Sequence, residues 1–180
     1  MYYTDYDIVF QEVPDETTMA LSISGCPYRC HGCHSSHLWQ RDAGTFLSYA
    51  ELERLIRRYE HSITCVCFMG GDADHYDLNM LMAFIREHYP TLRIAWYSGS
   101  DKFPEDIRYD LLSYIKLGHY DAARGPLTSP TTNQRFYAIV PASSACGPEG
   151  GVTTPSPSMA TVPSGFPEGL VDITNRFYRK

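Results

Sequence analysis

With 180 residues, the chain can form one domain with a sizeable core but not two domains of ordinary size. Its formal net charge of −6 and the lack of a basic cluster make nucleic acid a poor partner, because an acidic surface repels phosphate. No stretch approaches the roughly 18 consecutive apolar residues of a membrane span, so we expect no membrane partner. The first residues have neither the basic nor the apolar part of a secretory signal, and we expect a cytoplasmic protein with reduced cysteines.

The first predicted element is a strand over residues 18–24, which leads directly into three closely spaced cysteines. Cys26, Cys30 and Cys33 form a C-x3-C-x2-C pattern, so that one loop supplies three thiolates. Thiolates select zinc, copper(I) or iron–sulfur clusters. Because structural zinc sites and ordinary electron-transfer clusters use four protein ligands, three cysteines favour an iron–sulfur cluster with one iron open to a small molecule.

A zinc site is the alternative that this spacing leaves open. Its fourth ligand would be one of three nearby histidines, His31, His34 or His37. A disulfide framework is not expected, because nothing in the sequence points to secretion.

Helices and strands alternate after the cysteines. Residues 48–60 predict an amphipathic helix, and Ser48 with Glu51 three positions later forms a capping box at its start. The apolar run over residues 63–69 predicts a buried parallel strand, which ends at a Gly-Gly-Asp turn.

The same alternation continues in the next segment. Apolar spacing over residues 78–85 predicts a second helix, closed by Pro90, and residues 92–97 predict a third strand that stops at a Ser-Gly pair. Pro104 is placed as a first-turn residue of a further helix, and residues 114–117 predict a fourth strand. This order is typical of a parallel α/β sheet.

Functional groups of such sheets gather at the carboxyl ends of the strands. The cysteine loop, Gly70-Gly71-Asp72 and Ser98-Gly99 each follow a predicted strand directly. We therefore expect these three turns to meet at one edge of the sheet and form a single site.

The chain changes character near its end. Residues 141–169 hold six of the twelve prolines and no Lys, Arg or His, which predicts a disordered insertion because too little apolar surface is available for folding. It separates strand-like pieces at 135–140 and 170–174. We therefore divide the chain into a domain over 1–140, the insertion, and a C-terminal strand within 170–180 that returns to the core.

Three cysteines lie outside the loop. Cys65 and Cys67 are two apart in a predicted buried strand, so they point to one face and are interpreted as small core residues. Cys146 lies in the predicted insertion and is interpreted as an incidental thiol.

The cysteine pattern after a strand, with Gly-Gly-acidic after the next strand, resembles the radical S-adenosylmethionine (SAM) superfamily. Further segments resemble one of its families, the activating proteins of the anaerobic (class III) ribonucleoside-triphosphate reductases. These segments are Asp7 to Glu12, Cys33-His34 with Leu38-Trp39, Trp96 to Gly99, and Thr132 to Arg135. The resemblance runs from about Tyr6 to Tyr137 and resumes at Asp172, without covering the predicted insertion.

The resemblance implies a specific chemistry. Cys26, Cys30 and Cys33 would hold a [4Fe-4S] cluster, whose fourth iron would bind the amino and carboxylate groups of S-adenosyl-L-methionine. One electron would cleave the sulfonium carbon–sulfur bond to give methionine and a 5′-deoxyadenosyl radical. That radical would take a hydrogen atom from a glycine of the reductase and leave a glycyl radical there.

The resemblance also implies roles for the Gly-Gly-Asp turn. Gly70 and Gly71 would let the backbone approach SAM, with main-chain groups available to bond its amino end. Asp72 would add a negative charge beside the SAM ammonium or sulfonium, although the superfamily usually has the longer Glu there. The alternative for these residues is an ordinary turn.

Three other residues are candidates for cofactor contacts. Gly32 and His34 flank a ligand and would touch SAM or hydrogen-bond to cluster sulfur, and Ser98 would bond the SAM carboxylate or ribose. The alternative for His34 is that it caps the helix or loop that follows. Asn133, Gln134 and Arg135 either anchor the last strand or face SAM or the partner.

The expected fold is an α/β partial TIM-like barrel of the radical SAM type. About 140 residues cannot build a full eightfold barrel, which typically needs about 250. An incomplete barrel leaves an open side for a large protein substrate, and the implied partners are the reductase and a reduced flavodoxin or ferredoxin as electron donor.

Two other functions remain open. One is a small radical SAM enzyme acting on a small molecule, such as 7-carboxy-7-deazaguanine synthase, although a short chain has little left to build a substrate pocket. The other is a zinc- or iron–sulfur-binding module without turnover. Iron and sulfide content distinguishes zinc from a cluster, and product analysis with and without the reductase distinguishes the two enzymes.

Overall fold

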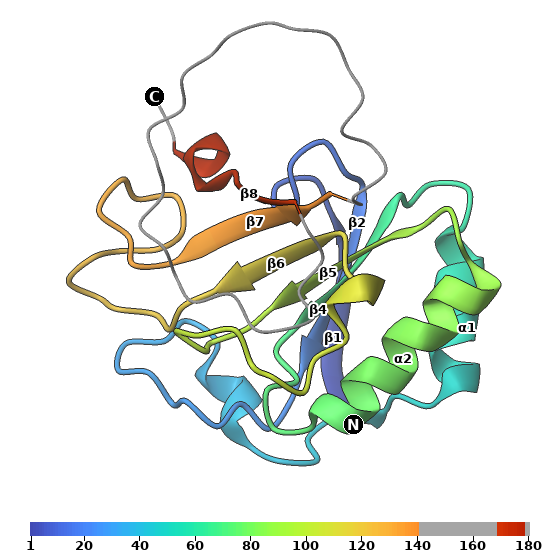
Figure 1. Cartoon of the computed structure of the whole chain (residues 1–180). Helices are drawn as coiled ribbons and strands as arrows, with labels where there is room; N and C mark the ends of the chain where they lie inside the picture. Colours follow the sequence, from blue (N-terminus) through green and yellow to red (C-terminus); the bar gives the residue numbers. More distant parts are fainter. Residues whose placement is uncertain (141–168, 179–180) are drawn as a thin grey trace, which may run out of the picture.

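One eight-stranded mixed sheet forms the centre of the molecule (Figure 1). The computed structural model describes residues 1–140 and 169–178. The strands are β1 (Tyr2–Val9), β2 (Thr18–Ile23), β3 (Thr45–Phe46), β4 (Cys65–Met69), β5 (Arg93–Tyr97), β6 (Tyr114–Leu117), β7 (Arg135–Ile139) and β8 (Leu170–Asp172). The helices are α1 (Tyr49–Tyr59) and α2 (His75–His88), with short 3-10 turns η1 (Ser36–Trp39), η2 (Tyr109–Leu111) and η4 (Thr174–Phe177).

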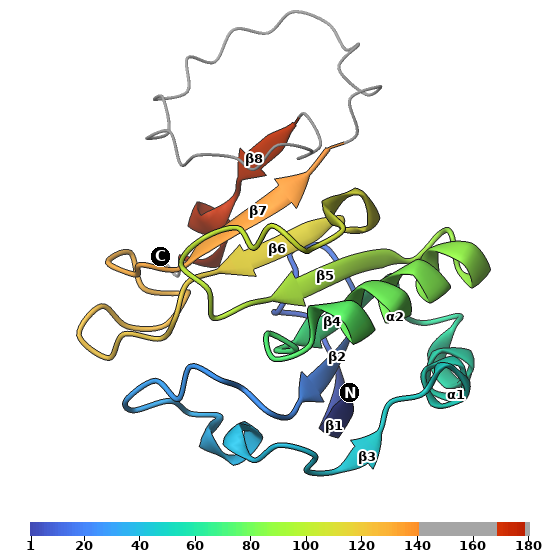
Figure 2. The ribbon, with the colours of Figure 1, turned by 60° about the horizontal axis from the view of Figure 1, so that its bottom comes forward.

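The strand order in the sheet is β3-β1-β2-β4-β5-β6-β7-β8. The four central strands, β2, β4, β5 and β6, run parallel to one another. The flanking strands pair antiparallel: β1 with β2 and β3 on one side, and β7 with β6 and β8 on the other. The predicted parallel sheet is therefore present only at the centre, and the described sheet is open, with β3 and β8 at its edges (Figure 2).

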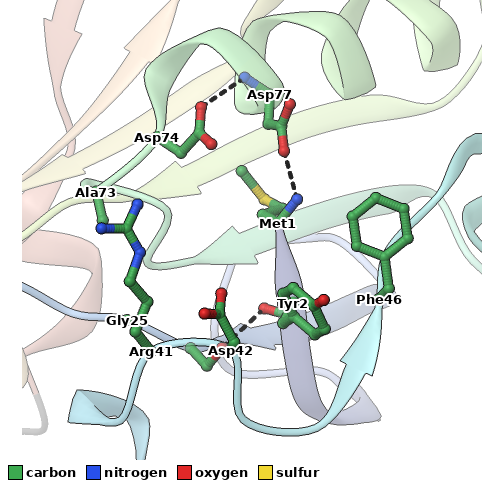
Figure 3. A pocket seen from close by; sticks show the side chains of 10 residues that line it. Met1, Tyr2, Gly25, Arg41, Asp42, Phe46, Ala73, Asp74 and Asp77 are labelled. Atoms are coloured by element: carbon green, nitrogen blue, oxygen red, sulfur yellow. Dashed lines mark hydrogen bonds and ion pairs between the residues drawn. The ribbon is translucent and has the colours of Figure 1, made fainter.

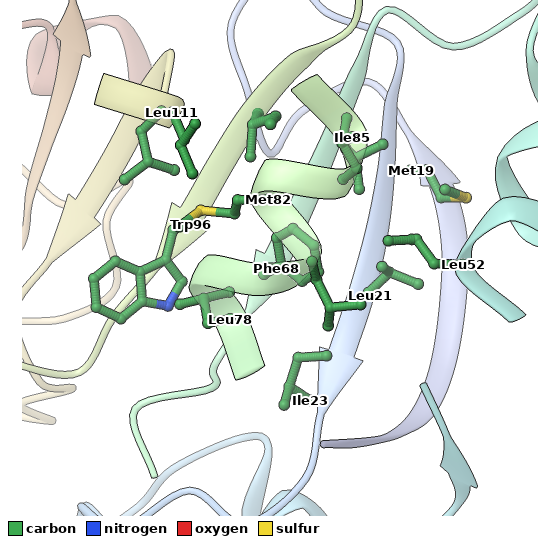
Figure 4. Close-up of a cluster of buried hydrophobic side chains, with 14 of the residues drawn as sticks. Met19, Leu21, Ile23, Leu52, Phe68, Leu78, Met82, Ile85, Trp96 and Leu111 are labelled. Carbon is green, nitrogen blue, oxygen red and sulfur yellow. The ribbon is translucent and has the colours of Figure 1, made fainter. Parts of the chain in front are cut away.

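Both α-helices lie on the same side of the sheet (Figures 1 and 2). Alternation along β4 sends Val66 and Phe68 into the main core under the helices. Figure 4 shows Phe68 in that core beside Leu21 and Met82. Burying each such side chain stabilises the fold by about 1.5–3 kcal/mol.

The opposite face of the sheet carries a smaller core. Cys65 and Cys67 pack there with Val13, Ala95 and Phe136, and all five are fully buried. The interpretation of the two cysteines as core residues on one face is confirmed.

The predicted helix over residues 48–60 is confirmed as α1, and half of its capping box is present. The Ser48 hydroxyl accepts a hydrogen bond from the Glu51 backbone N–H at 3.2 Å. The Glu51 carboxylate instead accepts hydrogen bonds from Tyr3 and Arg54, which ties the helix to β1. The second predicted helix is also confirmed and starts earlier than its apolar spacing, at His75, after the N-cap Asp74.

The helix expected from Pro104 is wrong. The segment contains only the turn η2, and its backbone is bound by side chains instead. Asn79 of α2 donates to the Asp106 carbonyl and accepts from the Arg108 N–H, while the Tyr109 hydroxyl donates to the Pro104 carbonyl. These contacts satisfy backbone groups that a helix would have paired internally.

The chain end returns to the sheet through β8. Val140 N–H donates to the Gly169 carbonyl at 2.9 Å, and Ile139 pairs with Leu170. The segment predicted to be disordered, and Cys146 within it, lie outside the described residues apart from Gly169. Over the described ranges, neither α-helix has the length and apolar content that crossing a membrane requires.

Candidate metal centre

Turns from neighbouring parallel strands meet at the carboxyl edge of the sheet. The Ser98 hydroxyl, after β5, donates a hydrogen bond to the Asp72 carboxylate, after β4. The Gly99 N–H donates to the same carboxylate at 3.3 Å. The ring of Tyr28, from the cysteine loop after β2, lies directly against Gly99. The expected convergence of these three turns is confirmed.

The cysteine loop is closed at its base by a single carbonyl. The N–H groups of Gly25 and Cys26 both donate to the Leu38 carbonyl, at 2.7 and 3.0 Å. Between these points the chain turns sharply through Arg29 and Gly32, whose φ values of 46° and 73° lie in the left-handed region. Glycine adopts this conformation at the least steric cost, which accounts for Gly32 next to the third cysteine.

All three loop thiols are half-buried and free of disulfides. Burial raises the pKa of Cys26, while backbone hydrogen bonds from Tyr28 and Arg29 act in the opposite direction. The Ser35 N–H points at the sulfur of Cys33, 3.4 Å away. N–H groups directed at sulfur stabilise thiolates, and they are the contacts that tune an iron–sulfur cluster.

The donor set fits a cluster. In the described part of the chain, no three His, Cys, Asp or Glu side chains are grouped as a single metal ion would require. Each thiolate of a cluster binds a different iron atom, so the three cysteines need not converge on one point. The histidines that would complete a zinc site, His31, His34 and His37, are exposed to solvent.

Gly32 and His34 lie against the loop that follows β6. A methyl at Gly32 would be 3.7 Å from Tyr120 and from Ala122. The His34 ring packs edge-on against Tyr120, with 5.4 Å between centroids. A fourth turn therefore joins the three that the sequence predicted.

Two hydrogen bonds with residues of β5 fix the Gly-Gly-Asp turn. Gly70 and Gly71 have φ values of 105° and 99°, which favour glycine at both positions. The Gly70 N–H donates to the Tyr97 carbonyl, and its own carbonyl accepts from the Trp96 indole, each at 2.9 Å. The Gly70 N–H is therefore already paired, while its carbonyl keeps a second acceptor site, so the role of Gly70 and Gly71 toward the SAM amino end stays a prediction.

The half-buried Asp72 and the buried Ser98 form one hydrogen-bonded unit. Burial raises the pKa of Asp72, whereas its hydrogen bonds from Ser98 and Gly99 act to lower it. Ser98 is 1% exposed, and its hydroxyl also accepts from the Ser100 N–H at 2.9 Å. The hydroxyl thus joins two turns of the site.

Sequence reasoning missed an ion-pairing contact and a buried lysine at this edge. Asp101, after β5, pairs with His119, after β6, at 2.8 Å. Lys116 lies buried at the end of β6. A lysine inside a short apolar strand is an unusual pattern, and it was the available signal for Lys116.

Asn133 and Gln134 hold the loop after β6. Their side-chain amides donate to the His119 carbonyl, at 3.0 and 3.4 Å. Arg135 bonds the carbonyls of Thr132 and Gln134. These contacts favour the interpretation that this segment anchors the last strands.

A small pocket lies next to the candidate site (Figure 3). Gly25, Arg41, Ala73 and Asp74 line it, and Asp77 on its far side pairs with the Met1 ammonium. Its volume of about 180 Å³ is below the roughly 300 Å³ at which small-molecule pockets begin. We therefore do not assign it as the cofactor site.

Comparison with known proteins gives one family. Residues 17–117 match the family model described as a 4Fe-4S single cluster domain, which covers more than half of the chain. The matched range begins just before β2 and ends with β6, so it contains the cysteine loop and the four parallel strands. No curated protein and no solved structure gives a significant match.

Proposed function

Because the chain belongs to the family of 4Fe-4S single cluster domains, we propose that it is a radical SAM enzyme that activates an anaerobic ribonucleoside-triphosphate reductase. Cys26, Cys30 and Cys33 hold the cluster. The observation that carries this proposal is the junction of the cysteine loop with the turns of Asp72 and Ser98 at one edge of four parallel strands. Three cysteines leave one iron without a protein ligand, which is where SAM binds.

When bound through Cys26, Cys30 and Cys33, the cluster would supply one electron for the reductive cleavage of SAM, giving methionine and the radical that would take a hydrogen atom from a glycine of the reductase. The protein residues position SAM. Asp72, held by Ser98 and Gly99, places negative charge close to Cys26 and favours the cationic groups of SAM. Gly32 and His34, both exposed and next to a proposed cluster ligand, are available to contact SAM or cluster sulfur.

The open sheet suits a protein substrate. We propose that its four parallel strands are the core of a partial barrel of the radical SAM type, whose open side admits the glycine loop of the reductase. Electrons come from a reduced flavodoxin or ferredoxin. We place the protein in the cytoplasm, because a cluster with an open iron needs reducing surroundings.

An anaerobic assay tests this function. The protein is reconstituted with iron and sulfide, reduced with dithionite and mixed with SAM and the reductase. We expect about four irons per chain, 5′-deoxyadenosine as a product, and a glycyl radical doublet in the electron paramagnetic resonance spectrum. SAM cleavage without the doublet would identify a small-molecule radical SAM enzyme, and bound zinc without cleavage would identify a binding module.

Two variants make the assignment of ligands specific. Cys30→Ala should abolish SAM cleavage and leave the chain folded, because its thiol is half-buried in a loop outside the core. Cys67→Ala is the control, since its thiol lies in the core on the helix-free face of the sheet. Cleavage at the wild-type rate by Cys30→Ala would show that the ligand set is wrong.

A further inference from the structure

Lys116 is a buried charge without an ion-pair partner. Among the described residues, Glu16 and Lys116 are the only buried side chains that carry a formal charge, each 8% exposed. Glu16 pairs with Arg93 at 2.8 Å and also accepts from the Tyr114 hydroxyl. Within the described chain, no carboxylate lies within 4.0 Å of the Lys116 ammonium. Burying an ammonium in this way is costly, so its retention calls for a physical reason.

The contacts of Lys116 place its charge at the carboxyl edge of the sheet. Its Nζ donates to the Gly118 carbonyl at 2.6 Å and is 3.4 Å from the Ser98 carbonyl. Both carbonyls belong to turns of the candidate centre, after β6 and β5. The Lys116 backbone pairs with Tyr97 of β5 and Phe136 of β7, and its carbonyl accepts from the Ser98 N–H at 2.8 Å, so its backbone is fixed between two strands. The ammonium is therefore held in place by rigid elements.

The titratable groups that interact with Lys116 all belong to the same site. Asp72, Cys30, Asp101 and Cys26 each act to raise its pKa, in that order. Burial is the larger effect and lowers the pKa of Lys116 to about 8, so the side chain is still protonated at pH 7. The groups come from three different turns, and two of them are the proposed cluster ligands. The positive charge thus interacts electrostatically with the cysteine loop.

We propose that Lys116 is the fixed counter-charge of the cluster and raises its reduction potential. The proposal rests on cluster binding by Cys26, Cys30 and Cys33 and does not depend on SAM cleavage. On reduction the cluster takes up one electron from an external one-electron reductant and becomes more negative. A nearby ammonium shielded from water stabilises the reduced form more than the oxidised form.

The test is a potentiometric titration of the reconstituted protein under anaerobic conditions, followed by electron paramagnetic resonance. We expect Lys116→Gln to lower the ratio of reduced to oxidised cluster about tenfold at a fixed potential, which is a shift of about 59 mV for one electron. Lys116→Arg retains the charge and should stay near the wild-type potential. Lys102→Gln removes an exposed lysine on the turn after β5, and water should screen its effect.

Each outcome decides the proposal. A lower potential in Lys116→Gln alone supports it, as does loss of the cluster from a folded Lys116→Gln while Lys116→Arg keeps it. Equal iron content and equal potentials in all four proteins would overturn it. A Lys116→Gln protein that does not fold, and so shows no thermal unfolding transition, would also overturn the proposal. Packing of the side chain, and not its charge, would then be the reason for a lysine at this position. These readouts do not involve SAM, so they remain distinct from the test of activity.

Discussion

Gly99 lacks a side chain where the ring of Tyr28 meets the backbone. A methyl at Gly99 would contact Cδ2 of Tyr28 and lie 2.9 Å from Cε2, closer than carbon atoms pack. Because Tyr28 is 41% exposed, its ring can turn outward and carry the cysteine loop with it. We expect Gly99→Ala to lower the iron bound per chain after reconstitution severalfold, while the thermal midpoint falls by only a few degrees.

A double variant provides the control for this prediction. Tyr28→Ala removes the obstacle, so Tyr28→Ala combined with Gly99→Ala should recover most of the iron that Gly99→Ala loses. Iron is measured per chain in the wild type, both single variants and the double variant. Wild-type iron content in Gly99→Ala would show that the ring and the loop move independently.

Glu51 makes stability depend on pH in the acid range. Hydrogen bonds from Arg54 and then from Tyr3 lower the pKa of Glu51 to about 2 from its usual value of 4.5. A carboxyl group with a lowered pKa contributes stability above its unfolded pKa and loses it as pH falls toward its folded pKa. We expect Glu51→Gln to reduce the free energy of unfolding by about 1 kcal/mol at pH 7, and by almost nothing near pH 2.

Chemical denaturation at several pH values measures this difference. Glu53→Gln is the matched control, because Glu53 pairs with Arg57 on the exposed face of the same helix. Its effect on the free energy of unfolding should be smaller at every pH. A constant difference between Glu51→Gln and wild type from pH 7 to pH 2 would contradict the assigned linkage.

At the scale of the element, α1 depends on its N-cap. Ser48 accepts the Glu51 N–H, which otherwise would lack a partner in the first turn. Ser48→Ala should lower the free energy of unfolding by about 1 kcal/mol. Ser35→Ala is the control, because Ser35 precedes η1 without making a side-chain cap bond. Thermal unfolding followed by circular dichroism compares the two, and equal losses would show that the cap bond is not the cause.

Elements with a strong periodic pattern were predictable, and elements defined by tertiary contacts were not. The buried parallel strands and both α-helices follow from apolar spacing, which agrees with their burial. β1 was missed because its side chains are mostly half-exposed and it lacks the apolar run that marks the central strands. At Pro104 the local sequence wrongly predicted a helix. There the Asn79 side chain hydrogen-bonds to backbone groups that a helix would have paired internally.

The candidate site shows the same division. Sequence order predicted that the turns of Cys26, Asp72 and Ser98 would meet, because parallel neighbours place their carboxyl ends together. It did not predict that Ser98 is buried behind Asp72, or that Lys116 reaches the same edge. Those facts depend on side-chain directions across three strands, which one sequence does not encode locally. The roles of these residues toward SAM stay predictions.

At the scale of the whole molecule, residues 141–168 join strand ends that already touch. Val140 bonds Gly169, and Gly169 must be kept because its φ is 117° and a side chain there would meet the Val140 carbonyl at 2.5 Å. A turn of about four residues therefore suffices to connect β7 and β8. We therefore consider a protein in which this short turn replaces residues 141–168. We expect its iron content to equal that of the full chain. Its free energy of unfolding should be higher by up to about 2 kcal/mol, because a shorter loop costs less entropy to close.

Thermal unfolding and iron per chain measure both effects in the shortened protein. A second shortened protein carrying Gly169→Ala serves as the control, since its added methyl should separate the strand ends and lower the midpoint. If the shortened chain raises or keeps its midpoint and keeps its iron, the sheet and the cluster site depend only on residues 1–140 and the returning strand. A lower midpoint or lost iron would instead assign residues 141–168 a part in folding or in the cluster site, and the division of the chain into domain and insertion would be wrong.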